Sequence, residues 1–389
     1  MSRMLSVKSR YAIILILLGL MALMEARHPS TYFRLATFIL AFLALAGMAS
    51  LLRGKLRDGF VVLASLALGL SIVEATATVL ESRDLLVTNG LFASQPIIGW
   101  GPAHAGRFHT EKTDSKSGAL IYRADYTIDS NLLRETRSAE TGPAIVFFGD
   151  SFIFGMGLND ADTLPQVFAD LLGRKQRVLN LGFPAYAPQQ FLAELQTGRF
   201  DGVIGAQPRL FIFTTMPEHA ERTACKSPWV RSGPRYMLEN GQVALKGACY
   251  EGLRLRLREW LEDMASYRFF IEPYLQRATH DDVDLWIRIL VAAVNLAHEK
   301  YGVATLINYI PDHGFLEGTG FSDDEIVQRL RDSGCTVVDV SLAQEEAADP
   351  TIRIKGDGHP TPLANRLKAS MLKDYIENHM PGILVAGMR

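Results

Sequence analysis

Three short segments of the sequence carry residue types that could together perform nucleophilic chemistry. The apolar run IVFFGDSFIFGMG contains Ser151, the run VLNLGFPAYAPQQ contains Gly182, and the string DGHPTP contains Asp357 and His359. A serine hydroxyl becomes a nucleophile when a histidine accepts its proton, and a carboxylate commonly orients that histidine. These residue types predict acyl transfer through a seryl intermediate, with Ser151 attacking, His359 as base and Asp357 orienting it.

The string around Ser151 also has a simpler interpretation. A Gly-Asp-Ser string at the end of a strand can serve turn geometry alone. Gly182, in contrast, follows an apolar run, and a glycine at a strand end lets its backbone N–H approach a ligand closely. We therefore expect the amides of Ser151 and Gly182 to form an oxyanion hole.

The elements that must position these residues follow the pattern of an α/β domain, in which short β-branched or aromatic runs alternate with segments of helical period. The expected strands are residues 144–149, 177–181, 210–215, 303–310 and 336–340. Helices are expected after a Thr163 cap, over residues 282–300, and after a Thr361 cap followed by Pro362. Ligands of an open parallel sheet bind beyond the carboxyl ends of its strands, where Ser151 and Gly182 lie.

Two segments interrupt this alternation. Residues 99–134 include the alternating stretch LIYRADYTI and predict a small β excursion ahead of the core. Asn240-Gly241, between two strand-like runs, predicts a two-residue hairpin.

The first eighty residues are unusually apolar and predict a transmembrane region. Three helices are expected over residues 11–26, 33–52 and 59–80, against the ~20 apolar residues that a spanning helix needs. The first group is short enough to resemble a signal-peptide core, but MEARH after it lacks a small-x-small cleavage site. Glu74 is either a functional intramembrane acid or a carboxylate that reaches the headgroups.

Basic residues flank these helices on one side. They are Arg3, Lys8 and Arg10 before the first helix and Arg53, Lys55 and Arg57 between the second and third. Because basic flanks remain in the cytoplasm, everything after about residue 81 is expected outside it, at an inner membrane with a periplasmic catalytic domain. The expected division is residues 1–80 as transmembrane region, 81–140 as linker and β-rich lead-in, and 141–389 as catalytic domain.

Charge and cysteine content restrict the partners. With 40 basic and 42 acidic residues, and no Lys/Arg-rich block interleaved with aromatics, the sequence argues against nucleic-acid binding. Cys225, Cys249 and Cys335 lack the short paired spacing of a zinc site, so no metal is expected. In an oxidising compartment Cys225 and Cys249 could form a disulfide, with Cys335 in the core; the alternative is three free thiols.

Together the three strings resemble the SGNH/GDSL hydrolase superfamily, from about Gly99 to Ala369. The matching blocks are FFGDSFIFGMGLNDADTLP, VLNLGFPAYAPQQ and DGHPTPLAN. The upstream pieces IGWGPAHAGRFH and YRADYTIDSNLLR look like the lead-in of membrane-anchored, polysaccharide-associated members. The resemblance implies a flavodoxin-like three-layer α/β/α fold, a serine esterase or acyltransferase activity, and no cofactor.

The resemblance assigns Ser151 as nucleophile, His359 as base, Asp357 as acid, and the Ser151 and Gly182 amides to the oxyanion hole. Two features depart from the pattern. The usual acid lies three residues before the histidine, where this chain has Gly356. The usual Gly-x-Asn-Asp block is replaced by TTMPEHAER.

Two further histidines follow expected strands. His219, in the substituted block, either donates to the oxyanion or is a surface residue paired with Glu218 or Glu221. His313 either lines the cleft or is a solvated loop residue.

The expected function is an extracytoplasmic esterase or O-acyltransferase acting on ester, notably acetyl, groups of a cell-envelope glycan. Its expected partners are the lipid bilayer, a carbohydrate or other ester substrate, and polysaccharide-synthesis or acyl-donor membrane proteins. The alternative is a catalytically silent module that binds glycan or scaffolds an export complex.

Overall fold

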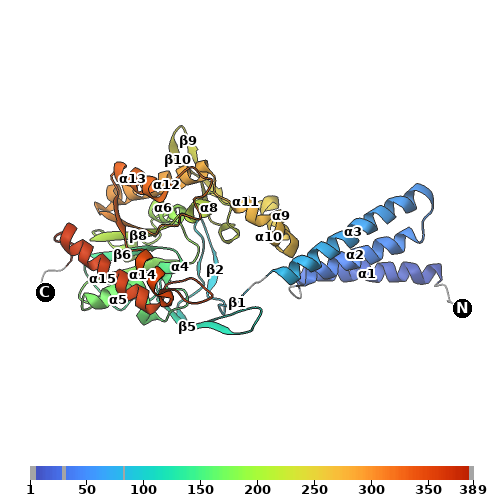
Figure 1. Cartoon of the computed structure of the whole chain (residues 1–389), viewed down its shortest axis with the longest axis horizontal. Coiled ribbons are helices and arrows are strands. Elements are labelled where there is room, and N and C mark those ends of the chain that lie inside the picture. Colours follow the sequence, from blue (N-terminus) through green and yellow to red (C-terminus); the bar gives the residue numbers. More distant parts are fainter. Residues whose placement is uncertain (1–5, 29–31, 82–83, 385–389) are drawn as a thin grey trace. The chain divides into compact units, whose positions relative to one another are not determined.

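A computed structural model of the chain describes residues 6–28, 32–81 and 84–384. The chain forms two compact units (Figure 1). The first consists of Met1–Ser82 and Leu253–Leu275, and the second of Arg83–Gly252 and Gln276–Arg389. The lead-in after residue 82 thus groups with the catalytic domain, and an internal segment groups with the N-terminal helices, which the sequence did not predict.

The second unit is built on a five-stranded parallel sheet in the order β7-β6-β8-β11-β12. The strands are β6 (Ala144–Gly149), β7 (Arg177–Gly182), β8 (Leu210–Thr215), β11 (Thr305–Tyr309) and β12 (Thr336–Asp339). In chain order this is 2-1-3-4-5, the flavodoxin-like arrangement. The predicted three-layer fold is confirmed, with each strand within two residues of its predicted limits.

Helices cover both faces of this sheet because side chains on each strand alternate between faces. Val146 and Phe148 of β6 join one core cluster, and Ile145 and Phe147 join the other. On the first face lie α6 (Pro188–Thr197), α12 (His280–Tyr301) and α13 (Asp323–Asp332). On the second lie α5 (Leu164–Leu171) and α15 (Pro362–His379), capped by Thr163 and Thr361 as predicted.

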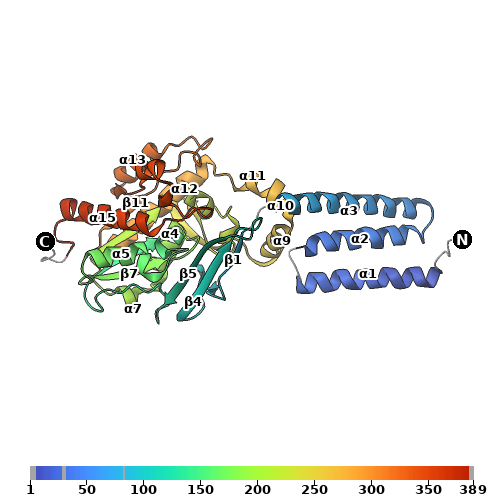
Figure 2. The same cartoon turned by 60° about the horizontal axis from the view of Figure 1, so that its bottom comes forward.

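Smaller elements surround the sheet. The lead-in forms the antiparallel set β1 (Leu85–Val87), β4 (Gly106–Thr113) and β5 (Leu120–Ile128), seen in Figure 2, and the pair β2 (Phe92–Gln95) and β3 (Gly99–Pro102). The predicted hairpin joins β9 (Pro234–Glu239) to β10 (Gln242–Ala248). The short helices are α4 (Ser151–Phe154), α7 (Asp201–Ile204), α8 (His219–Thr223), α14 (Ala343–Ala348), η1 (Asp160–Asp162), η2 (Pro228–Val230) and η3 (Pro350–Ile352).

A buried arginine joins the lead-in to the segment after the nucleophile. Arg134 donates to Asp160 at 2.8 Å and to the carbonyls of Phe154 at 3.1 Å and Leu158 at 2.8 Å. The guanidinium also lies over the Tyr126 ring of β5. The lead-in is therefore a structural part of the second unit.

The first unit contains α1 (Val7–Arg27), α2 (Phe33–Ala49) and α3 (Gly54–Leu80). By length and composition α1 and α3 could cross a membrane, whereas α2 has 17 residues, fewer than the predicted segment 33–52. Many large apolar side chains of α1 and α3 are exposed. Spanning is thus supported most directly for α1 and α3.

The same unit contains α9 (Gly252–Glu262), α10 (Ala265–Phe270) and α11 (Glu272–Gln276). Glu74 of α3 accepts hydrogen bonds from the amides of Ala265 and Ser266, at 2.8 and 3.0 Å, and from the Ser266 hydroxyl at 2.6 Å. The structure gives Glu74 a role that the sequence did not predict. Its buried carboxylate caps the N-terminus of α10, whose free amides need an acceptor.

Candidate active site

Ser151 lies at the carboxyl end of β6, where it begins the short helix α4. The preceding Asp150 is the N-cap, and its carboxylate accepts from the Phe152 amide at 2.9 Å. Gly149 of β6 pairs with Gly182 of β7, so both predicted site segments end at the same edge of the sheet.

The structure brings Ser151, His359 and Asp357 into one hydrogen-bonded chain. The Ser151 hydroxyl lies 2.8 Å from His359 Nε2, and His359 Nδ1 donates to Asp357 Oδ1. A proton can therefore pass from the serine oxygen to the imidazole while the carboxylate holds the ring. This is the geometry that serine acyl transfer requires.

The unusual spacing of acid and base has a backbone explanation. The amide of Ile354 donates to the His359 carbonyl at 2.8 Å, and the Gly358 amide donates to the Ile354 carbonyl at 2.9 Å. Gly358 adopts φ 89°, a left-handed conformation that glycine accepts without strain. This tight loop turns Asp357 back onto the ring of the histidine two residues later.

Lys112 of β4 is a supporting residue that the sequence did not predict. Its ammonium donates to the second carboxylate oxygen of Asp357 at 2.8 Å and lies 3.2 Å from Asp84. Burial alone would raise the pKa of Asp357, but its contacts with His359 and Lys112 lower that pKa to about 2. Because 245 residues separate Lys112 from Asp357, no local pattern could have linked them.

Gly182 does not offer its amide to a ligand as predicted. Its N–H donates to Asn180 Oδ1 at 3.0 Å, while Asn180 Nδ2 donates to the Ile153 carbonyl at 2.9 Å. Glycine is required here by packing, since an added Cβ would lie 2.5 Å from the Phe154 nitrogen of α4. Gly182 lets β7 approach the helix that carries the nucleophile.

Near these strand ends, the amides of Ser151 and Ala185 have no hydrogen-bond partner among the described residues. Ala185 lies in the loop after β7 and has φ 65°, a left-handed conformation uncommon for a residue with a side chain. An oxyanion hole needs unpaired N–H groups, so Ala185 replaces Gly182 as the candidate second donor.

His219 is neither exposed nor free to donate. Its side chain is fully buried, with Nδ1 3.0 Å from Thr215 Oγ1 and Nε2 3.3 Å from Asp150 Oδ2. In the neutral ring the single N–H serves Asp150, which leaves none for an oxyanion. Pairing with Glu218 or Glu221 at the surface was also wrong. His313, by contrast, is 87% exposed and pairs with Asp323, as a loop histidine would.

An aromatic ring packs against His359. Phe152 contacts the His359 ring edge to face at 5.5 Å between centroids. The Arg353 guanidinium lies 5.3 Å and the Lys368 ammonium 5.7 Å from the centre of the same Phe152 ring. Burial, with a smaller effect of Arg353, lowers the pKa of Lys368 to about 8.

A cavity of about 260 Å³ opens between the residues that flank the nucleophile and the base. It is lined by Phe152, Met216, Glu218, Ile310, Pro311, Asp312, Glu346, Arg353 and Gly358. Burial, together with the neighbouring carboxylate of Asp312, raises the pKa of Glu218 to about 7. The walls are thus mixed, with apolar surface and several carboxylates.

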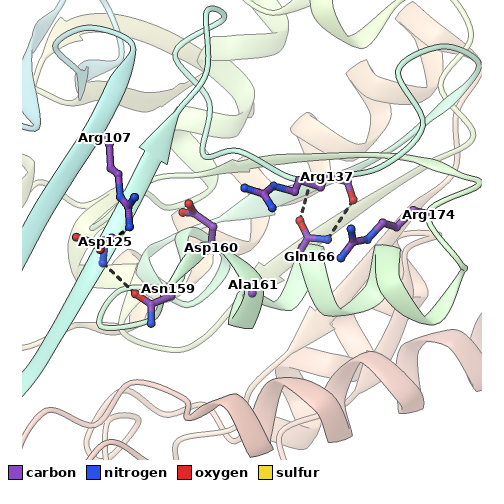
Figure 3. Close-up of a pocket in the computed structure, with 8 residues that line it drawn as sticks. All are labelled: Arg107, Asp125, Arg137, Asn159, Asp160, Ala161, Gln166 and Arg174. Carbon is purple, nitrogen blue, oxygen red and sulfur yellow. Dashed lines mark hydrogen bonds and ion pairs between the residues drawn. The ribbon is translucent and has the colours of Figure 1, made fainter.

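A second cavity, of about 210 Å³, lies away from the catalytic chain and contains three arginines (Figure 3). Each guanidinium already has a carboxylate partner: Arg107 pairs with Asp125, Arg137 with Glu135 and Arg174 with Asp170. The dashed contacts of Gln166 in Figure 3 join it to Arg137 and so tie the lead-in to α5.

The cysteines divide as one of the two sequence interpretations predicted. Cys225 and Cys249 form a disulfide with a Cα–Cα distance of 5.4 Å, and Cys335 is a buried free thiol. Within the described residues no group of three or more His, Cys, Asp or Glu side chains could hold a metal ion.

No protein-family profile and no curated protein matches the sequence. Solved structures similar to the chain include a lipolytic protein of the G-D-S-L family from Veillonella parvula, with 13% identity, a TM-score of 0.38, and coverage of 61% of this chain and 99% of that one. A psychrotrophic esterase from Pseudoalteromonas has 11% identity, a TM-score of 0.37, and coverage of 61% and 98%. A carbohydrate acetylesterase family member from Sinorhizobium meliloti has 12% identity, a TM-score of 0.33, and the same coverages.

Proposed function

We propose that this chain is a membrane-anchored serine esterase or O-acyltransferase that acts outside the cytoplasm on small acyl esters, notably acetyl groups, of a cell-envelope glycan. The observation that carries the proposal is the chain Ser151–His359–Asp357, with 2.8 Å between the serine oxygen and the imidazole. A buried carboxylate, an imidazole and a hydroxyl in this order form the nucleophilic device of acyl transfer.

The reaction proceeds in two steps. His359 takes the Ser151 proton as the serine oxygen attacks the ester carbonyl, and the unpaired amides of Ser151 and Ala185 stabilise the oxyanion. The imidazolium then protonates the departing alcohol, leaving an acyl-Ser151. A water or a sugar hydroxyl, deprotonated by His359, attacks this ester and releases the free acid or a new sugar ester, and Ser151 regains its proton.

The cavity favours a small acyl group on a polyol. A volume of about 260 Å³ is at the lower end of ordinary ligand pockets and leaves little room for a long acyl chain beside a sugar. Glu218 and Asp312 are acceptors for hydroxyl groups, and the raised pKa of Glu218 keeps part of its population protonated near neutral pH and able to donate.

Two features support the location outside the cytoplasm. The Cys225–Cys249 disulfide is typical of an oxidising compartment, and the basic residues around the N-terminal helices predict that residues after about 81 lie outside. A glycan at the envelope, together with membrane proteins that supply acyl groups or synthesise polysaccharide, would then be within reach.

A fluorophosphonate probe tests the activity on the full-length protein in detergent. We expect the wild type to be labelled, Ser151→Ala to be unlabelled, and the exposed-serine control Ser333→Ala to label normally.

Substrate assays test the acyl group and the acceptor. Acetylated oligosaccharides should be deacetylated faster than octanoyl esters, and an added sugar acceptor should reveal acyl transfer through the formation of acyl-sugar. If Glu218→Gln loses activity on the sugar ester but hydrolyses an aryl acetate at the wild-type rate, Glu218 binds the sugar part of the substrate.

A second function has one observation in its favour. Neither Gly182 nor His219 presents an N–H to an oxyanion, so the chain could instead be a silent module that binds glycan or scaffolds an export complex. Folded wild-type protein that does not react with the probe but retains acetylated oligosaccharides on a column would favour this module over the enzyme.

A further inference from the structure

The internal segment Leu253–Leu275, which belongs to the unit of the N-terminal helices, exposes large apolar side chains and buries a charged one. On α9, the large side chains Leu253, Leu257 and Trp260 follow one another at spacings of four and three residues and therefore share one face. That face is exposed: the three residues are 81, 56 and 41% accessible. Arg258 on the same helix is 8% accessible.

The interior of this segment is polar. Arg258 donates to Glu262, to Glu272 at 2.9 Å and to the Tyr267 hydroxyl at 2.8 Å. These groups join α9 to α10 and α11. The charged side chains therefore form the inner contact of the three helices.

The apolar exterior continues beyond α9. Five further large side chains are exposed in α10, α11 and the residue between them: Phe269, Phe270, Ile271, Tyr274 and Leu275. With the three of α9, eight large apolar side chains are exposed within 23 residues, a higher density than the scattered single exposures of ordinary surfaces. We call Leu253–Leu275 the insert.

The exposed apolar side chains of the insert would be unfavourable if water were their only surroundings. An amphipathic helix in water turns its apolar stripe toward the core and its charges outward, because each Å² of apolar surface left in water costs about 25 cal/mol. In the insert, the charges of Arg258, Glu262 and Glu272 face one another, whereas the large aromatic and aliphatic groups face out. That polarity suits a helix lying in an apolar or interfacial medium.

The medium follows from the attachment of the insert to α3. Glu74, near the C-terminal end of α3, caps α10, and Glu81 just after α3 pairs with Arg268 at 2.6 Å. Figure 2 shows α9 and α10 beside this end of α3 within the first unit. Val79 and Leu80 are exposed there, so the apolar surface of the spanning helix continues onto the insert.

A further ion pair fixes the insert to α2. Arg34, in the first turn of α2, is 2% accessible and donates to Asp263, between α9 and α10, at 3.1 Å. Its guanidinium lies 5.3 Å from the centre of the Trp260 ring. Two of the helix ends expected on the outer side of the membrane therefore hold the insert.

We infer that the insert is an interfacial element that embeds its apolar face in the outer leaflet of the bilayer crossed by the N-terminal helices. The inference rests on the membrane anchoring in the proposed function, but not on the esterase activity. Leu253, Leu257, Trp260 and the Phe269–Leu275 run enter the headgroup and acyl boundary, about 5–10 Å deep. Arg254 and Arg256, exposed at the two edges of this face of α9, remain at the level of the lipid phosphates.

Fluorescence quenching by brominated lipid tests this depth. The full-length protein is placed in nanodiscs of phosphatidylcholine, with or without bromine at the 6,7 positions of the acyl chain. We expect bromine to quench part of the emission, and Trp260→Phe to abolish most of that quenched part. Trp229→Phe is the matched control, since Trp229 is 68% exposed but belongs to the other unit, and it should leave the quenching unchanged.

A second variant tests whether a loss of quenching reflects reduced insertion into the lipid rather than unfolding. In Leu253→Glu/Leu257→Glu, Trp260 remains but the face is charged, so the Trp260 quenching should fall while the disulfide and the thermal transition are retained. Quenching that is the same in wild type and Trp260→Phe overturns the inference, as does recovery of the chain in the soluble fraction without detergent. Absence of phosphonate labelling would overturn the esterase alone and leave the quenching result standing.

Discussion

Two of the Asp–His pairs in the second unit, Asp357–His359 and Asp150–His219, are built from the same parts. In one, Lys112 contacts Asp357, Asp357 contacts His359, and His359 contacts the hydroxyl of Ser151. In the other, Arg222 contacts Asp150, Asp150 contacts His219, and His219 contacts the hydroxyl of Thr215. Cation, carboxylate, imidazole and hydroxyl follow in the same order in both.

The difference lies in exposure. The His359 side chain is 20% exposed, and the residue before it lines the larger cavity, whereas the His219 side chain has no exposed surface. Burial lowers the pKa of His219 to about 4, so this ring remains neutral at ordinary pH. Hydrogen-bond order alone therefore does not identify a catalytic triad, because the imidazole must also be able to gain a proton beside a substrate. The His219 pair instead braces Asp150, the residue before the nucleophile.

The largest effect that would sharpen this comparison is expected at Asp357. Asp357→Asn preserves shape but allows the wrong tautomer of His359, so kcat should fall on the order of 10⁴-fold with KM nearly constant. Hydrolysis of an aryl acetate measures it, with circular dichroism to check folding. A kcat equal to that of the wild type would mean that Asp357 is not the orienting acid.

Replacing Arg222 should instead lower the free energy of unfolding. Asp150 is 1% exposed, and removing the guanidinium with Arg222→Met leaves its buried carboxylate with less compensation. Losing one partner of a buried pair costs about 3–5 kcal/mol, which denaturant unfolding would record. Arg174→Met, which removes an exposed i,i+4 pair with Asp170, is the control and should leave the unfolding free energy nearly unchanged. If the two variants unfold alike, the second pair is not a brace.

Lys112 is the equivalent cation of the Asp357–His359 pair, and replacing it should lower kcat. A hydrogen bond to a charged group contributes about 1.5–3 kcal/mol, so Lys112→Met should reduce kcat about 10- to 100-fold through the orientation of Asp357. Lys112→Arg should restore part of the rate, and KM should hardly move. A purely structural role would lower the melting temperature of both variants and leave the kcat of the folded fraction intact.

These pairs also show what the sequence could and could not predict. The strands and the positions of Ser151, Asp357 and His359 follow from local patterns: β-branched runs, caps such as Thr361, and polar residues at strand ends. The flavodoxin-like arrangement of the sheet was implied only by the family resemblance. Lys112 and the contact of His219 with Asp150 depend on pairs 69 or more residues apart, and Ala185 depends on a single φ value. The insert was missed for a related reason, because its apolar stripe reads like that of a core helix until the polar interior around Arg258 is seen.

The smallest expected effect concerns the pH dependence of the buried pair. The pKa of His219 is about 4 in the folded chain and about 6.5 in a model peptide, so unfolding takes up a proton between these values. Stability should therefore decrease as the pH falls from about 6.5 to about 4, by about 1–3 kcal/mol near the lower limit. His219→Gln keeps a donor for Asp150 but cannot titrate, so its unfolding free energy should lack this decrease even if it is lower overall.

Denaturant unfolding at pH 7 and pH 4.5 measures the difference between the wild type and His219→Gln. Equal pH slopes would mean that His219 carries a proton in the folded state, and the contrast with His359 would then fail.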